Sequence, residues 1–158
     1  MTKEKKQEFT RKITQANRSE IIVLLYEIAL TYLRDAKSEM EQKEWVSYKQ
    51  SIRKIQNCIS ELMNSLNFEY DISYQLMQLY TYVNREAIKA NIRRKREHLD
   101  HIEHVLVPLL GSFKEVSKQD NSQPVMENAQ SVIAGLTYGK NTLNESLQDL
   151  GVSRGFRV

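Results

Sequence analysis

The stretch IIVLLYEIALTYL, residues 21–33, decides the fold class of this chain and raises a question about its surface. Only Glu27 and Thr31 interrupt its apolar character, and because they are four residues apart they lie on one line along a helix. A helix that covers a single small core needs an apolar stripe only a little wider than about 100°. This helix offers far more, so the question is what covers the surplus.

The composition favours a single all-α domain. The chain has 158 residues, only five Gly and two Pro, and many residues that favour helices, such as Glu, Lys, Gln, Leu and Ala. Its longest apolar run, IIVLLY, is too short for a signal sequence or a membrane span, so we expect a cytosolic protein without stable membrane insertion. The lone cysteine, Cys58, excludes an internal disulfide and suits a reducing compartment, where we expect a packed thiol.

The apolar periodicity predicts four amphipathic helices. Asn17 and Glu20 have the spacing of a capping box, so the first helix is expected over about 18–40. The third and fourth are expected over about 72–92 and 99–116, and Pro108 predicts a kink or a break in the fourth. The second helix carries the strongest signal, an unbroken heptad seam made of Trp45, Tyr48, Ile52, Ile55, Ile59, Leu62 and Leu66.

The short connections between these helices predict an antiparallel up-down four-helix bundle. We expect the bundle over 17–117, a flexible N-terminal arm over 1–16, and a linker and C-terminal extension over 118–158. The segment VMENAQSVIAGL, 125–136, predicts a short helix in that extension.

Three histidines spaced by threes, His98, His101 and His104, raise the possibility of a metal site. In the heptad frame set by Leu99 and Ile102, however, all three fall at outward positions. A buried site would also need ligands from a second helix and supporting hydrogen bonds. We therefore expect a solvated helix face, with no metal and no cofactor.

Catalysis is not expected. GLTYGKN, 135–141, lacks one residue of a phosphate-binding loop and has Asn141 where Ser or Thr is required, so we interpret it as a turn. No nucleophile elbow or paired-carboxylate motif is visible. Two alternatives remain: a nucleic-acid-binding bundle that uses the basic cluster Arg93–Arg96, and a helical metalloenzyme built around His98 and His101. Acidic residues follow the basic cluster and no aromatic residue is interleaved, which favours a solvated turn and no nucleic acid.

Tyrosines gather around the start of the predicted third helix, at Tyr70, Tyr74, Tyr80 and Tyr82. Tyr side chains suit a surface that buries apolar area yet keeps a wet edge, as partner-binding grooves do. The alternative is that these rings simply cap the core.

Three segments together resemble the FliS family of flagellin export chaperones over about residues 9–117. They are FTRKITQANRSEIIVLLYEIALTYL (9–33), ISELMNSLNFEYDISYQLMQLYTYVNREAIKANIRRKREHL (59–99) and LLGSFKEV (109–116). AGLTYGKNTLNES and RGFRV are similar to an extension that some clostridial-type members carry. The resemblance implies a cytosolic, non-enzymatic helical bundle that holds the disordered C-terminal segment of flagellin. It would prevent premature polymerisation and aid delivery to a component of the type III export gate.

A client held as amphipathic helices would need long apolar grooves on the chaperone. We expect the groove to be lined by six side chains, with an arm that in the family can lie over the groove as a lid. The predicted groove residues are Ile22, Tyr26, Ile59, Leu62, Met77 and Tyr80, and the predicted lid residues are Phe9 and Ile13.

The segment NAQSVIAGL, 128–136, is similar to the endings of many bacterial flagellins. One hypothesis is that it occupies part of the client groove as an internal mimic. The alternative is a chance resemblance, because a short apolar pattern arises easily.

Overall fold

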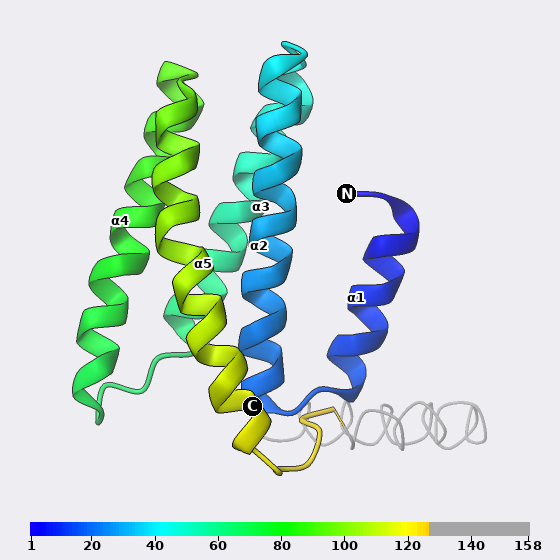
Figure 1. Ribbon diagram of the computed structural model, residues 1–158, viewed down its shortest axis with the longest axis vertical. Helices are drawn as coiled ribbons and strands as arrows, with labels where there is room; N and C mark the ends of the chain where they lie inside the picture. The colour runs from blue at the N-terminus through cyan, green and yellow to red at the C-terminus, as the bar shows by residue number, and fades with distance from the viewer. Residues whose placement is uncertain (127–158) are drawn as a thin grey trace, which may run out of the picture.

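Five helices make up residues 1–126, the part of the chain that the computed structural model describes (Figure 1). The all-helical prediction is confirmed for these residues. The predicted short helix at 125–136, the turn at 135–141 and the flagellin-like segment at 128–136 lie wholly or almost wholly outside them. The helices are α1 (Lys3–Gln15), α2 (Arg18–Glu41), α3 (Trp45–Asn64), α4 (Asp71–Arg93) and α5 (Arg96–Gln119).

The predicted capping box at the start of α2 is confirmed. The Asn17 side chain accepts a hydrogen bond from the Glu20 backbone N–H at 2.9 Å, and the Glu20 carboxylate accepts one from the Asn17 backbone N–H at 2.8 Å. These two bonds satisfy backbone donors that a helix start leaves free, so they fix where α2 begins.

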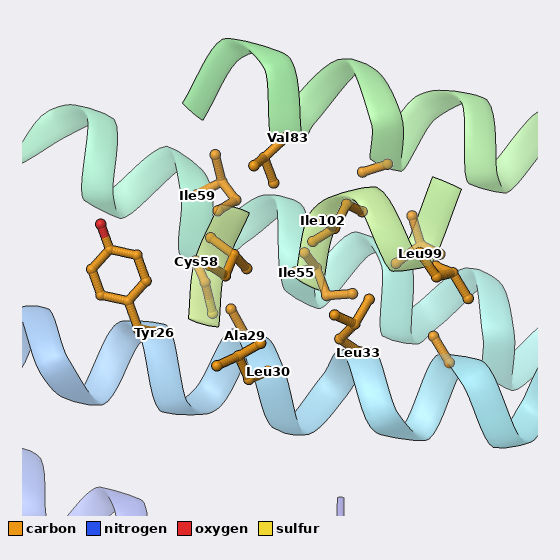
Figure 2. Packing of buried hydrophobic residues seen from close by; sticks show 14 of the residues in the cluster. Tyr26, Ala29, Leu30, Leu33, Ile55, Cys58, Ile59, Val83, Leu99 and Ile102 are labelled. Carbon is orange, nitrogen blue, oxygen red and sulfur yellow. The ribbon is translucent and has the colours of Figure 1, made fainter. Parts of the chain in front are cut away.

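The principal contacts of α2–α5 form a closed ring, in which α2 packs on α3, α3 on α4, α4 on α5, and α5 on α2. Five of the seven seam residues predicted for α3 are buried in the shared core, part of which Figure 2 shows. The remaining two, Trp45 and Leu66, are half-buried, and Leu66 lies just beyond the end of the helix. Cys58 is buried as expected, and this burial raises the pKa of its thiol to about 11.

The break considered at Pro108 does not occur, because α5 continues through this residue to Gln119. Pro108 is exposed, so water can reach the backbone carbonyl that loses its helical donor there. In Figure 1 the later part of α5 leans away from the direction of its first part, as proline-containing helices do.

Two buried tyrosines join α2 to α4 inside the core. The hydroxyl groups of Tyr26 and Tyr80 hydrogen-bond to each other, and both rings are almost fully buried. The Phe113 ring of α5 stacks on Tyr26 with 5.4 Å between ring centroids. Burial is the main cause that raises the pKa of both tyrosines, so both hydroxyls keep their protons at neutral pH.

Because each hydroxyl is the partner of the other, we expect Tyr26→Phe to lower the free energy of unfolding by about 1–3 kcal/mol, since it leaves the Tyr80 hydroxyl buried and unpaired. The double variant Tyr26→Phe/Tyr80→Phe should recover part of that loss, because no unpaired group remains. Urea unfolding of the two single variants and the double variant measures this coupling. Additive losses would contradict it.

Candidate functional site

Helix α1 covers the surplus apolar surface of α2. Its sequence, KEKKQEFTRKITQ, is mostly polar, but Phe9 and Ile13 are four residues apart and therefore lie on one side of the helix. Phe9 is only 7% exposed and forms a second, smaller core with Ala16 and Leu24. The partly buried side chains that pack against this core are Met1, Ile13, Ile21 and Ile28.

α2 therefore has two apolar faces. One face, which includes Tyr26, Ala29 and Leu33, belongs to the main core of the ring (Figure 2). The other, which includes Leu24, meets α1, and Ile28 packs against both cores. The excess width of the apolar surface over 21–33 thus reflects two separate packing partners.

Few interactions hold α1 in place. Among the helices described, its principal contact is α2, and Figure 1 shows it standing apart from the ring. The N-terminal ammonium group of Met1 pairs with the Asp35 carboxylate of α2. A 13-residue helix is marginal by itself in water, and burying one Phe side chain contributes only about 1.5–3 kcal/mol. Detaching α1 should therefore cost less than unfolding the ring.

The chain after α5 returns to the junction between α1 and α2. The Asn17 side-chain amide donates to the carbonyl of Asp120 at 3.2 Å, and the Val125 N–H donates to the carbonyl of Ala16 at 3.1 Å. The Ser19 hydroxyl also bonds to the Asp120 carboxylate. These contacts fix the point at which α1 leaves α2.

Open space flanks α1 on α2. A cavity of about 370 Å³ is lined by residues that include Ala16, Leu24 and Ser117. A second cavity of about 250 Å³ is lined by residues that include Phe9, Leu30 and Leu110, so it lies between α1, α2 and α5. Lys12 of α1 lines both cavities, and other charged side chains, such as Glu20 and Lys114, line their edges. We call the surface that α1 covers, together with these two cavities, the trough.

The predicted groove residues divide between the core and the partly exposed surface. Tyr26, Ile59, Leu62 and Tyr80 are at most 1% exposed and belong to the main core, whereas Ile22 and Met77 are half-buried. The predicted lid residues Phe9 and Ile13 both lie in α1. Sequence reasoning did not select the residues of α2 beneath α1, which are Ile21, Leu24 and Ile28.

An exposed apolar patch lies where α3 turns into α4. Tyr70 is 63% exposed, and Ile72 and Tyr74 are also exposed. The Phe68 ring meets Tyr74 edge to face, with 5.1 Å between centroids. Tyr80 instead lies in the main core and Tyr82 packs against it, so Tyr70 and Tyr74 are the exposed members of the predicted tyrosine cluster. Contiguous exposed patches of this kind mark interaction surfaces.

The basic cluster is partly engaged within the protein. The Arg94 guanidinium lies 4.4 Å from the centroid of the Trp45 ring, and Arg96 pairs with the Glu41 carboxylate. These contacts leave fewer free cations for phosphate than the sequence suggests.

The prediction that all three histidines face outward is wrong for His98, which is only 4% exposed. α5 packs against both α2 and α4, so positions that flank its apolar seam also meet a neighbouring helix. His98 and His101 both bond to the buried Glu86 carboxylate of α4. Burial would raise the pKa of Glu86, but hydrogen bonds from Lys89 and both histidines lower it to about 2.

Since Phe9 is the largest side chain that α1 buries, we expect Phe9→Ala to detach α1 while the ring stays folded. Backbone amides of α1 should exchange with deuterium at least ~10-fold faster, whereas those of α3 and α4 keep their protection. Thr10→Ala, an exposed change on the same helix, is the matched control and should leave exchange unaltered. Unchanged protection of α1 in Phe9→Ala would contradict the weak attachment.

Comparison with known proteins gives the family. The sequence model of the family "Flagellar protein FliS" matches residues 1–120. The flagellar secretion chaperone FliS of Bacillus subtilis (strain 168) is 24% identical over 108 residues, which cover 68% of this chain and 81% of the relative. In the part of the chain that the structure describes, no helix combines the length and apolarity needed to cross a membrane. Because the family model spans most of the chain, this protein belongs to the FliS family of flagellar secretion chaperones.

Proposed function

We propose that this chaperone binds the disordered C-terminal segment of flagellin in the cytosol, prevents its premature polymerisation and aids its delivery to the export gate. The observation that carries the proposal is the second apolar face of α2, which among the described helices is covered mainly by the short helix α1. This face belongs to the stable ring, whereas α1 is held weakly. A ligand that binds the face more strongly than α1 does can therefore displace α1.

The client would bind by displacing α1. An amphipathic client helix that presents apolar side chains at i, i+3, i+4 and i+7 fits an apolar trough of this kind. The 13 residues of α1 span about 20 Å, which is between three and four helical turns. Leu24, Leu30 and Leu110 line the cavities beside α1 and would contact the client once α1 has left.

The exposed patch at Phe68, Tyr70, Ile72 and Tyr74 supplies a second contact for the same client. A disordered segment loses conformational entropy when it binds, which costs roughly 2–5 kcal/mol or more. The contacts in one short groove offset only part of this cost. A second apolar surface allows another amphipathic stretch of the client to bind and offsets more of that loss.

Nucleic-acid binding through Arg93–Arg96 is the less favoured function, because Arg94 and Arg96 already contact Trp45 and Glu41. The two functions differ in their response to salt. Binding through apolar burial should survive an increase in ionic strength, whereas phosphate binding weakens steeply.

We expect Leu24→Gln to weaken binding of a flagellin C-terminal peptide at least ~10-fold, since it places an amide in the apolar face of α2 that the client would bury. Phe9→Ala should instead tighten binding, because a larger fraction of the protein then has α1 detached. Isothermal titration calorimetry at two salt concentrations measures both effects.

Val46→Gln is the matched control for Leu24→Gln, because Val46 lies on α3 and is 76% exposed. It should bind the peptide like the unaltered protein. Equal affinities for the unaltered protein and Leu24→Gln, or no gain in Phe9→Ala, would show that the client binds elsewhere.

A further inference from the structure

Helices α4 and α5 bring a buried carboxylate against two imidazoles. The Nδ1 atoms of His98 and His101 each lie 2.8 Å from the same oxygen of Glu86, Oε2. The other carboxylate oxygen accepts a hydrogen bond from Lys89 at 2.9 Å. Glu86 is 3% exposed, so the whole arrangement is anchored inside the protein, with His101 at its solvent side.

One atom of this arrangement lacks a partner. When Nδ1 of His98 donates to Glu86, Nε2 carries a lone pair that needs a donor. That Nε2 atom is buried and has no hydrogen bond. The group beside it is a second acceptor, Glu97 Oε1, at 3.6 Å. A buried acceptor that faces another acceptor is unfavourable.

We propose that Glu86, His98 and His101 form a binding site for a divalent transition metal, with Zn²⁺ as the ion of choice. A metal bound at Nδ1 of His98 places the ring hydrogen on Nε2. Nε2 then becomes a donor directed at Glu97, so the orphaned atom gains a partner. Histidine ligands of metals commonly donate their other N–H to a carboxylate in this way.

The geometry suits a small ion with nitrogen and oxygen ligands. The three ligand atoms come from two helices and lie within 4.8 Å of one another. Tetrahedral Zn²⁺, with bonds of about 2.0–2.2 Å, separates its ligand atoms by roughly 3.4 Å. The two 2.8 Å contacts must therefore lengthen slightly, and the ring with room to move is that of His101, because His98 is buried. Water can fill the fourth position from that side.

Lys89 opposes the metal with its own positive charge. The metal would bind Oε2 of Glu86 while Lys89 keeps Oε1, so two cations share one carboxylate. This repulsion limits the affinity, and removing it should tighten binding. A bound ion would link α4 to α5 and would have no need of α1 or the trough beneath it.

The test uses the full-length chain without a polyhistidine tag, titrated with Zn²⁺ alone in a calorimeter. We expect one Zn²⁺ per chain, and Co²⁺ in its place should give the visible absorption of a tetrahedral site. His101→Ala should lower the affinity at least ~10-fold. Lys89→Met should raise it several-fold. Both side chains are about half exposed, so circular dichroism should show that both variants keep their fold.

His104→Ala is the matched control, because His104 lies on the same helix and is exposed, and its Nδ1 contacts a backbone carbonyl outside the cluster. It should bind Zn²⁺ like the unaltered chain. The proposal is overturned if the unaltered chain binds no stoichiometric Zn²⁺. An affinity that is unchanged in His101→Ala or in Lys89→Met, or lost in His104→Ala, overturns it as well.

Discussion

Helix α2 has apolar side chains around most of its circumference, and the ring formed with α3, α4 and α5 covers only one side of it. The position of α1 and the two cavities beside it depend on how the remaining side is covered. α1 covers it with Phe9 and Ile13, the apolar line of an otherwise polar helix. An apolar face exposed to water favours aggregation, and α1 removes part of this face from water.

The two cores of the molecule differ in strength for clear physical reasons. The main core contains long, fully buried side chains from four helices and the Tyr26–Tyr80 hydrogen bond. The smaller core contains three buried residues, and the side chains that α1 contributes to it are Phe9 and the partly buried Ile13. Stability is therefore concentrated in the ring, and α1, which is held by few interactions, covers the face where we propose that the client binds. This division suits a chaperone that must stay folded while it exchanges its cover for a client.

The Glu86–His98–His101 cluster lies on α4 and α5. None of the hydrogen bonds described for it reaches a residue that lines the trough beneath α1. It joins the end of α4 to the start of α5, where Lys95 gives α5 no side-chain cap. The buried Glu86 carboxylate, shared by two imidazoles of α5, links the two helices beside their contacts in the main core. We therefore expect the cluster to contribute to the packing of α4 against α5.

The sequence by itself determined α2–α5, their approximate limits and most of the main core, because heptad spacing and the Asn17–Glu20 capping box are local properties of the chain. It did not predict α1, since residues 1–16 were expected to form a flexible arm and only Phe9 and Ile13 give α1 an apolar line. It also showed that residues 21–33 have more apolar surface than one core needs. Only the tertiary structure decided which residues of that surplus meet α1, since Leu24 and Tyr26 look equally apolar in sequence and face different partners. The same reason explains His98: its burial depends on α4, and the ligand that completes the cluster, Glu86, is twelve residues away on that other helix.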